Sequence, residues 1–389
     1  MQNFKLPSNV TEVLKTLEAN GFEGYIVGGC VRDILLGKTP NDWDITTSAL
    51  PEHVIELFPR TVDIGKLHGT IGVIFGKDEI IEVTTYRIDG EYIDNRRPET
   101  VTFTPNLSDD LARRDFTINS LAYNEISGII DLFDGINDLS NKTIRCVGNA
   151  NKRFQEDALR MLRAIRFAAK LGFTIENDTY NAIINNAELI QNISVERIRI
   201  EFDKILLSDN PQMLVNIVDT RLYEFFFPNL GETDSDTLAI LRKLPKNLNI
   251  RLASLGESIL ELLIKLKYDN ETKNAGKTLV KYHDLQIEPT KISVKRAIQK
   301  VGEEYFLDLL QLKNANDLRE IYFEIKKNRE PLSTSELAID GQDLIQLGIK
   351  EGKQIGESLK HLLDLVLENS DLNNREALIE KVGEIRGNS

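Results

Sequence analysis

The sequence has few of the residues that cross-link a chain or anchor it in a membrane. Its 389 residues include only two cysteines, Cys30 and Cys146, which are too few for a disulfide framework or a cysteine metal knuckle. No apolar run is long enough to cross a bilayer, and residues 1–10 are polar where an export signal would be basic and then apolar. These absences predict a cytoplasmic protein with reduced thiols and no membrane partner.

Positive charge is also scarce overall. The chain has 48 Lys and Arg against 61 Asp and Glu, a formal net charge of -13. This balance argues mildly against nucleic acid as a partner, because phosphate backbones are bound by clustered cations. The cations are nevertheless bunched, at Arg96–Arg97, Arg113–Arg114, residues 152–170 and residues 291–300. Local patches bind phosphate whatever the net charge, so the net charge excludes little.

The pattern of apolar residues changes near residue 145. Before it, runs rich in β-formers are bounded by Gly, Pro or Asp; after it, apolar residues recur three and four apart, as in amphipathic helices. The expected strands are residues 24–29, 43–47, 70–75, 80–87 and 101–105, with helices at 10–20 and 31–36. The pattern predicts an α+β fold: a mixed α/β head with a small sheet, followed by an all-helical remainder. Since 389 residues exceed one hydrophobic core, several packed units are expected.

Two acidic residues lie two positions apart in the segment NDWDITT, residues 41–47, which otherwise has the pattern of a strand. Successive strand side chains point to opposite faces, so Asp42 and Asp44 would share one face. Paired carboxylates repel each other unless a cation lies between them, and a divalent metal ion is the usual one. A solvated acidic pair at a strand end is the common alternative, so the neighbouring motifs must decide.

Glu82 is a third acid, in the next long strand segment, where Ile81 and Val83 suggest that it is buried. It is either a sheet residue facing solvent or a ligand or support of a metal site. Three acids from two strands would hold two magnesium ions for in-line phosphoryl transfer. Such chemistry requires basic residues around a triphosphate.

A candidate phosphate cradle precedes the acids. In VGGCVRD, residues 27–33, a strand leads into two glycines and a helix then opens with Arg32 and Asp33. Glycine allows close approach of the backbone, a helix N-terminus offers free amides to an anion, and Arg32 adds donors. Most Gly-Gly turns only solve a steric problem, but this one lies one helix before the acidic pair.

Two arginine-rich segments supply further candidates. LARRDFTINSLAY, residues 111–123, is read as a helix or helix start carrying Arg113, Arg114 and Asp115, and EDALRMLRAIRF, residues 156–167, places Asp157, Arg160, Arg163 and Arg166 at helical spacings of three. The simpler alternative for Arg113 and Arg114 is a surface arginine pair. In the second segment, Glu156 and Asp157 could simply pair with the arginines across turns. A carboxylate beside a guanidinium also presents an acceptor and donors in one plane, as reading a base edge requires.

In chain order these segments resemble the class II tRNA nucleotidyltransferases, the CCA-adding enzymes of the polymerase-β-like nucleotidyltransferase superfamily. The motifs that carry the resemblance are GGCVRD, DWD, RRDFTINSLAY, DGINDL, EDALRMLRAIRF and ERIRIEFDKIL. They lie within residues 24–207, and residues 337–368 resemble the C-terminal region of the bacterial members. The resemblance therefore covers most of the chain.

The resemblance implies a role for each matching residue. The catalytic acids are Asp42, Asp44 and Glu82, of which Asp42 and Asp44 hold the metal. The residues that bind the triphosphate of the nucleotide are Gly29, Arg32 and Arg114. Its base is bound by Asp157 and Arg160, and Arg163 and Arg166 line the same pocket. The implied cofactor is Mg²⁺ in a two-metal site. The implied substrates are CTP, ATP and the acceptor end of a tRNA, whose elbow is also bound, and no obligate protein partner is expected.

The resemblance also implies an organisation. It places a catalytic head at residues 1–145, a helical neck for base selection at 146–207, a helical body at 208–330 and a helical tail for tRNA binding at 331–389. Residues 87–98 match the flexible loop needed for terminal A addition, and DGINDL matches a hinge. Lys291, Lys295, Arg296 and Lys300 are either phosphate contacts or a solvated helix face. The implied function is template-independent addition of C, C and A to the tRNA 3′ end, with release of pyrophosphate.

Other interpretations remain open. An A-adding enzyme shares these motifs, whereas the intact segment 87–98 disfavours an enzyme that adds only CC. The sequence DIGKLHGTIGVIF from residue 63 lacks the basic stretch typical of bacterial poly(A) polymerases. The four histidines suggest no His-Asp hydrolase site. A non-catalytic RNA-binding or tRNA-binding protein is a different class of alternative, and the complete set of acids and arginines argues against it.

Overall fold

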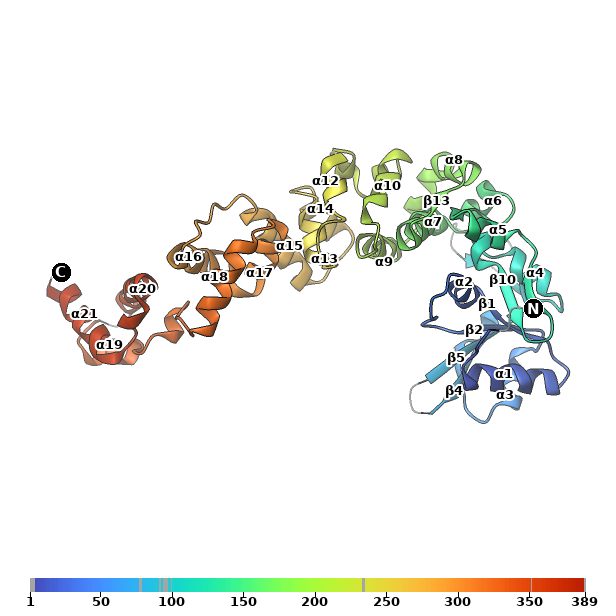
Figure 1. Cartoon of the computed structure of the whole chain (residues 1–389), viewed down its shortest axis with the longest axis horizontal. Coiled ribbons are helices and arrows are strands. Elements are labelled where there is room, and N and C mark those ends of the chain that lie inside the picture. The colour runs from blue at the N-terminus through green and yellow to red at the C-terminus, as the bar shows by residue number, and fades with distance from the viewer. Residues whose placement is uncertain are drawn as a thin grey trace. The chain divides into compact units, whose positions relative to one another are not determined.

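The computed structural model describes residues 4–76, 79–90, 92–93, 97–98, 100–232, 235–350 and 352–387. The chain divides into two compact units, Met1–Arg242 with Lys265–Lys267, and Lys243–Ile264 with Tyr268–Ser389. Strands gather in the N-terminal part and helices make up the rest, so the predicted α+β class is confirmed (Figure 1). Among the described residues, no helix is long and apolar enough to cross a membrane.

A seven-stranded mixed sheet, in the order β11-β10-β1-β2-β5-β4-β3, forms the centre of the head. Its strands are β1 (Gly24–Val27), β2 (Asp44–Thr47), β3 (Thr61–Gly65), β4 (Thr70–Phe75), β5 (Glu79–Thr85), β10 (Leu121–Asn124) and β11 (Gly128–Asp131). β1 runs antiparallel to β2 and β10, whereas β2 runs parallel to β5. The end of β1 and the start of β2 therefore lie side by side, in the middle of the sheet.

The two faces of this sheet are covered differently. On one face Ile45, Val83 and Ile71 are register partners and are fully buried; α1 (Ser8–Ala19) packs on β1, and α3 (Pro51–Leu57) packs on β4 and β5. On the other face Leu111 of α4 (Leu107–Ala112) joins a buried cluster with Tyr25 of β1 and Ala122 of β10. That cluster involves β1 and β10, and the same face carries exposed side chains farther along the sheet, on β5 and β3.

The predicted elements of the head are largely confirmed. Helices form at α1 and α2 (Gly29–Leu35), and each expected strand segment contains a strand, the last one being β9 (Val101–Phe103). The helical interpretation of residues 111–123 is wrong, because α4 ends at Ala112 and the segment continues through a short 3₁₀ turn into β10. Strands β3, β10 and β11 were not predicted.

The predicted flexible loop, residues 87–98, is described only in part. β6 (Arg87–Asp89) pairs with β9, and β7 (Tyr92–Ile93) pairs with β8 (Arg97–Pro98). Residues 91 and 94–96 of the loop lie outside the described residues, so its role stays a prediction.

Helices dominate the chain after the head. The head ends with α5 (Gly135–Ser140), and the helices that follow it as far as residue 240 are α6 (Ala150–Glu156), α7 (Leu159–Leu171), α8 (Asn177–Asn186), α9 (Val195–Leu206), α10 (Val215–Asp219), α11 (Tyr223–Phe226) and α12 (Ser235–Ile240). One detail of the all-helical prediction is wrong, because Thr174–Ile175 forms a short strand, β13, parallel to β12 (Thr143–Ile144).

The second unit contains two separate hydrophobic cores. Its helices are α13 (Leu248–Ala253), α14 (Ile259–Lys265, shared with the first unit), α15 (Asn270–Tyr282), α16 (Lys291–Val301), α17 (Glu303–Leu312), α18 (Asn316–Lys327), α19 (Gly341–Gln346), α20 (Lys353–Glu368) and α21 (Arg375–Gly387). One core includes Phe306 and lies among α13 and α15–α18; the other includes Leu362 and lies among α19–α21. Lys295 of α16 is 2% exposed and paired with Glu330. Neither prediction for this lysine, phosphate contact or solvated face, fits such burial.

Candidate active site

The three predicted acids approach one another at the centre of the sheet. Asp44 is the first residue of β2 and is the register partner of Glu82 on the parallel strand β5, so both side chains project from the same face. Asp42 lies in the bend before β2, and its predicted place within the strand is wrong. The predicted burial of Glu82 is also wrong, since its side chain is exposed.

The negative charges of these carboxylates affect one another's pKa values. Asp44 keeps access to solvent, yet surrounding protein displaces part of its water and raises its pKa; the charge of Asp42 raises it further and Arg114 lowers it. Partial loss of water, followed by the charges of Asp44 and Asp42, raises the pKa of Glu82. Such mutual repulsion is what a bound cation relieves. In the described part of the chain, no three His, Cys, Asp or Glu side chains form a ready-made metal cluster.

A glycine turn and two arginines lie close to the acids, where β1 ends and β2 begins. Gly28 has φ 78°, and a Cβ built on it would lie 3.0 Å from Nη1 of Arg114. The turn therefore needs glycine both for its backbone conformation and for the arginine beside it. Arg32 is 3% exposed and donates to Asn119 Oδ1 at 2.6 Å and to Asp33 Oδ1 at 2.8 Å. Gly29, the predicted contact, opens α2 next to Gly28.

In the nucleotide site that the resemblance to the CCA-adding enzymes implies, replacing Gly28 with Ala should raise the KM for CTP about tenfold, the equivalent of roughly 1.4 kcal/mol. The new methyl group would strain the backbone and displace Arg114. Steady-state incorporation with varied CTP checks this. Gly37→Ala is the matched control, because Gly37 also has positive φ but has open space around it. Equal effects of the two changes would show that backbone strain alone is responsible.

Asp110 anchors Arg113 and Arg114, of which Arg114 is a predicted triphosphate contact. It accepts from Arg113 at 2.6 Å, from Arg114 at 3.1 Å and from the Thr46 hydroxyl at 3.1 Å. Burial alone would raise its pKa, but the charges of Arg114 and Arg113 outweigh burial and lower it. Since Thr46 lies two residues after Asp44, this network fixes Arg114 near the acids.

The predicted base-reading residues lie around a break between two helices. Asp157 ends α6 and stands outside α7, so its predicted place in one helix with Arg160 is wrong. Its Oδ2 accepts from Arg197 at 2.9 Å, and its Oδ1 accepts from the Leu159 amide at 3.1 Å. Arg160 pairs with Glu156 at 2.6 Å, as the simpler interpretation predicted. The amide of Arg160 donates to the carbonyl of Asp157 at 3.0 Å, so the two residues are one turn apart, and each side chain has its own partner.

The remaining two arginines of α7 are also paired. Arg163 donates to Asp115 at 2.5 Å, and the pKa of Asp115 is held at about 2: burial alone would raise it, but the nearby Arg163 outweighs burial. Arg166 lies 2.5 Å from Glu201 of α9 and 4.0 Å from the centre of the Phe167 ring. These pairs hold α7 against the head and against α9.

Phe167 joins the two predicted groups of arginines. The guanidinium of Arg32 lies 5.3 Å from its ring centre and that of Arg163 lies 5.5 Å from it. Because an aromatic face attracts cations, this buried ring holds arginines from both groups around one point. Arg32, a predicted triphosphate contact, therefore lies close to Arg163 and Arg166, which are predicted to line the base pocket.

Sequence reasoning missed several partners that hold this arrangement. Asp110 could have been found, because it precedes Arg113 and Arg114 by three and four residues. Asn119, Arg197 and Glu201 carry no such signal, since each meets its partner across at least 35 residues of chain.

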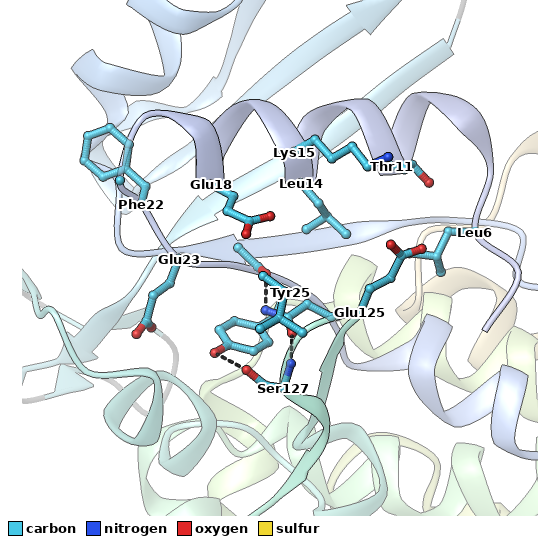
Figure 2. A pocket seen from close by; sticks show the side chains of 14 residues that line it. Leu6, Thr11, Leu14, Lys15, Glu18, Phe22, Glu23, Tyr25, Glu125 and Ser127 are labelled. Carbon is cyan, nitrogen blue, oxygen red and sulfur yellow. Dashed lines mark hydrogen bonds between the residues drawn. The ribbon is translucent and has the colours of Figure 1, made fainter. Parts of the chain in front are cut away.

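A cavity of about 380 Å³ lies at the other end of β1 (Figure 2). It is bounded by α1, by the start of β1 and by the turn between β10 and β11, and Tyr25 and Ser127 meet there with their oxygens 3.4 Å apart. None of the predicted site residues lines it. The acids and this cavity are therefore separate features of the head.

Comparison with known proteins decides the family. Residues 24–145 match the family model "Poly A polymerase head domain", residues 172–233 match "Probable RNA and SrmB- binding site of polymerase A", and residues 248–382 match "tRNA nucleotidyltransferase domain 2 putative". The CCA-adding enzyme of Limosilactobacillus reuteri is 40% identical over 394 residues, covering 96% of this chain and 95% of that protein. The CCA-adding enzyme of Lactobacillus delbrueckii subsp. bulgaricus is 39% identical over 398 residues, covering 98% of this chain and 99% of that protein. The chain belongs to the CCA-adding enzymes.

The fold agrees with this membership. The crystal structure of the Bacillus stearothermophilus CCA-adding enzyme in complex with CTP superposes with a TM-score of 0.83 at 32% identity, covering 99% of both chains. CCA-adding enzymes are tRNA nucleotidyltransferases, and the superfamily typically uses metal ions. The head model carries the name of poly(A) polymerases, but the two relatives above, which cover 96% and 98% of this chain, are CCA-adding enzymes.

Proposed function

We propose that this CCA-adding enzyme transfers C, C and A from CTP and ATP to the 3′ end of tRNA at the acids of β2 and β5, with Mg²⁺ as cofactor. The observation that supports the site most directly is the register of Asp44 with Glu82, next to Asp42 and the Gly28 turn. Among the relatives, the Bacillus stearothermophilus enzyme is described in complex with CTP and the Thermotoga maritima enzyme in complex with tRNA.

The donor set suits magnesium. Mg²⁺ prefers oxygen ligands and is usually bound through one or two carboxylates, with substrate phosphates and water completing its shell. Asp42 and Asp44 provide those carboxylates; burial is the main cause that raises the pKa of Asp44, and the charge of Asp42 raises it further. When bound, the metal ions would activate the attacking hydroxyl and stabilise the charge of the departing pyrophosphate. Glu82, beside Asp44, would support the pair.

The arginines would orient the nucleotide. Arg114, held by Asp110 close to Asp44, would meet the charge of the triphosphate, and Arg32 would reinforce the turn at Gly29 through its bonds to Asp33 and Asn119. The RNA 3′ oxygen would form a bond to the α-phosphate while the bond to pyrophosphate breaks. Positioning and charge stabilisation account for most catalysis of this kind.

Base selection would fall to the start of α7. Asp157 offers acceptor oxygens and Arg160 offers donors, the two functions that a cytosine or adenine edge requires. Their present partners, Arg197 and Glu156, would be exchanged for the base. Arg163 and Arg166 would line the pocket through their contacts with Phe167.

We also propose the division into a head (1–145), neck (146–207), body (208–330) and tail (331–389). The head boundary agrees with the family match to residues 24–145, and the separate core of α19–α21 supports a distinct tail. The helical parts would bind the acceptor stem and elbow of tRNA by shape and backbone contacts. The protein would act in the cytoplasm, where tRNA is processed.

The test is incorporation on a tRNA that lacks its last three nucleotides, with magnesium and with CTP, ATP or both. We expect two additions with CTP alone and a third only when ATP is also present. A product ending at CC with both nucleotides would contradict terminal A addition, a long adenosine ladder would favour a poly(A) polymerase, and no incorporation would favour a binding protein. Product length on a sequencing gel distinguishes these results.

A further inference from the structure

The row of residues that contains the acids continues across the sheet. Asp44 of β2 pairs with Glu82 of β5, Glu82 pairs with Gly72 of β4, and Gly72 pairs with Val62 of β3. Directly paired residues point their side chains to the same face of a sheet. Val62 therefore projects from the face that carries the acids, at the far end of this row.

Three aliphatic side chains meet over Gly72. A Cβ built on this glycine would lie 2.9 Å from Val62, 2.7 Å from Ile64 and 2.8 Å from Ile80. These three residues, which we call the aliphatic platform, are 38%, 46% and 49% exposed. Single exposed apolar residues are ordinary, but contiguous ones mark an interaction surface. Glycine leaves room for the three side chains to lie across β4.

The platform begins next to the acids. Ile80 is two residues before Glu82 on β5, a separation of about 7 Å along a strand. On the other side of the acids, toward β1 and β10, lie Arg114 and the cluster under α4, where the proposed function places the incoming nucleotide. The second reactant must then approach from the side of β4 and β3.

We propose that the aliphatic platform receives the 3′-terminal base of the RNA acceptor and thereby positions its 3′-hydroxyl at Asp44 and Glu82. An aliphatic surface packs against the face of any base without reading its edge, because it offers no hydrogen-bonding group. This property suits the proposed function, on which the inference rests, since the terminal base of the acceptor changes after every addition. Bases bound by their faces alone are bound with little sequence preference.

The experiment compares the double variant Ile64→Thr, Ile80→Thr with the control Ile126→Thr. Ile126 is 63% exposed in the turn between β10 and β11, so its change removes a similar apolar surface from the same head. We expect the double variant to raise the KM for tRNA lacking CCA about fivefold, with the KM for CTP within about twofold of the unaltered enzyme, if roughly 1 kcal/mol of base packing is lost. The control should change neither constant.

Crosslinking supplies a readout that a merely structural change would not give. A tRNA ending in a 3′-terminal 4-thiouridine, irradiated without CTP and ATP, should crosslink to residues 61–82 of the unaltered protein and several-fold less to the double variant. Since no incorporation is needed, this arm tests the platform even if the proposed function fails. Val62→Thr is a second variant with the same expectation.

Two results would overturn the inference. One is a crosslink that maps outside residues 61–82 together with an unchanged KM for tRNA. The other is loss of self-association of the double variant in sedimentation with both constants unchanged, because β3 is an edge strand and an exposed edge can pair with a second copy. That second result would assign the platform to a protein contact.

Discussion

Replacing Asp44 with Asn should lower the rate of nucleotide incorporation about 1000-fold while leaving tRNA binding intact. The amide keeps the shape of the side chain but removes the charge that would hold the metal next to Asp42. Loss of about 4 kcal/mol of charge stabilisation, the order expected of a metal site, corresponds to this factor. Single-turnover incorporation on a tRNA lacking CCA measures the rate, and filter retention of the same tRNA measures binding. Asp42→Asn should behave alike.

Glu125→Gln is the matched control for this loss. Glu125 is an exposed carboxylate of the same head, in the cavity at the other end of β1, and its change removes the same charge from another place. We expect its rate to stay within about twofold, because an exposed group away from the reactants contributes little. Incorporation by the Asp44 variant within about tenfold of the unaltered rate would remove Asp44 from the catalytic residues. Parallel loss of tRNA binding would instead mean that the head is misfolded.

Sequence reasoning succeeded where structure is locally encoded. The strands of β-branched residues, such as TIGVIF at β4, form where predicted, because their pattern suits a sheet with one buried face. β3 was missed because TVDIG contains an aspartate and a glycine and lies at an edge, where little burial constrains it. β10 was taken for a helix because its short apolar segment suits either state; pairing with β1, about a hundred residues earlier, decides it.

The candidate site shows the same division. The types of residue and their order along the chain predicted the acids and arginines, but not the contacts that hold them. Asp115 meets Arg163 across 48 residues, and Arg197 meets Asp157 across 40. Rules based on helix or strand spacing predict contacts only between residues a few positions apart, so they could not predict these pairs. The break at Asp157 was likewise missed, because residues 156–167 read as one amphipathic helix although the backbone is extended at Asp157.

Lys295 gives the clearest case in the second unit. A lysine on an amphipathic helix reads as a solvated cation, yet this one donates to Glu330 Oε2 at 2.6 Å, to Ser370 Oγ at 2.7 Å and to the Leu367 carbonyl at 3.3 Å. Glu330 follows α18, Leu367 lies in the last turn of α20 and Ser370 follows α20, so one buried ammonium joins α16 to the end of α20. Helical periodicity of α16 alone contains no information about them.

Replacing Glu330 with Gln should therefore lower the free energy of unfolding by about 3 kcal/mol, because it leaves the ammonium of Lys295 buried without its counter-charge. Urea unfolding followed by circular dichroism measures the loss. The control is the exposed ion pair of Arg296 and Glu368, whose charged atoms are 3.0 Å apart. Arg296 is the residue after Lys295 in α16. Glu368→Gln should cost less than about 1 kcal/mol, as exposed ion pairs do. Equal losses in the two variants would contradict the assignment of stability to the buried pair.

The effect should also depend on pH in one direction. Burial alone would raise the pKa of Glu330, but hydrogen bonds from Lys295 and Lys291 outweigh burial and hold it at about 2, below its ordinary value of 4.5. A carboxyl group whose pKa is lowered by folding stabilises the fold fully above its unfolded value, and that stability is lost as the pH falls toward the folded value. The difference between the unaltered protein and Glu330→Gln should thus be constant from pH 6 to 8 and shrink between about pH 4.5 and 2. A difference that grows on acidification would show that another group controls this contact.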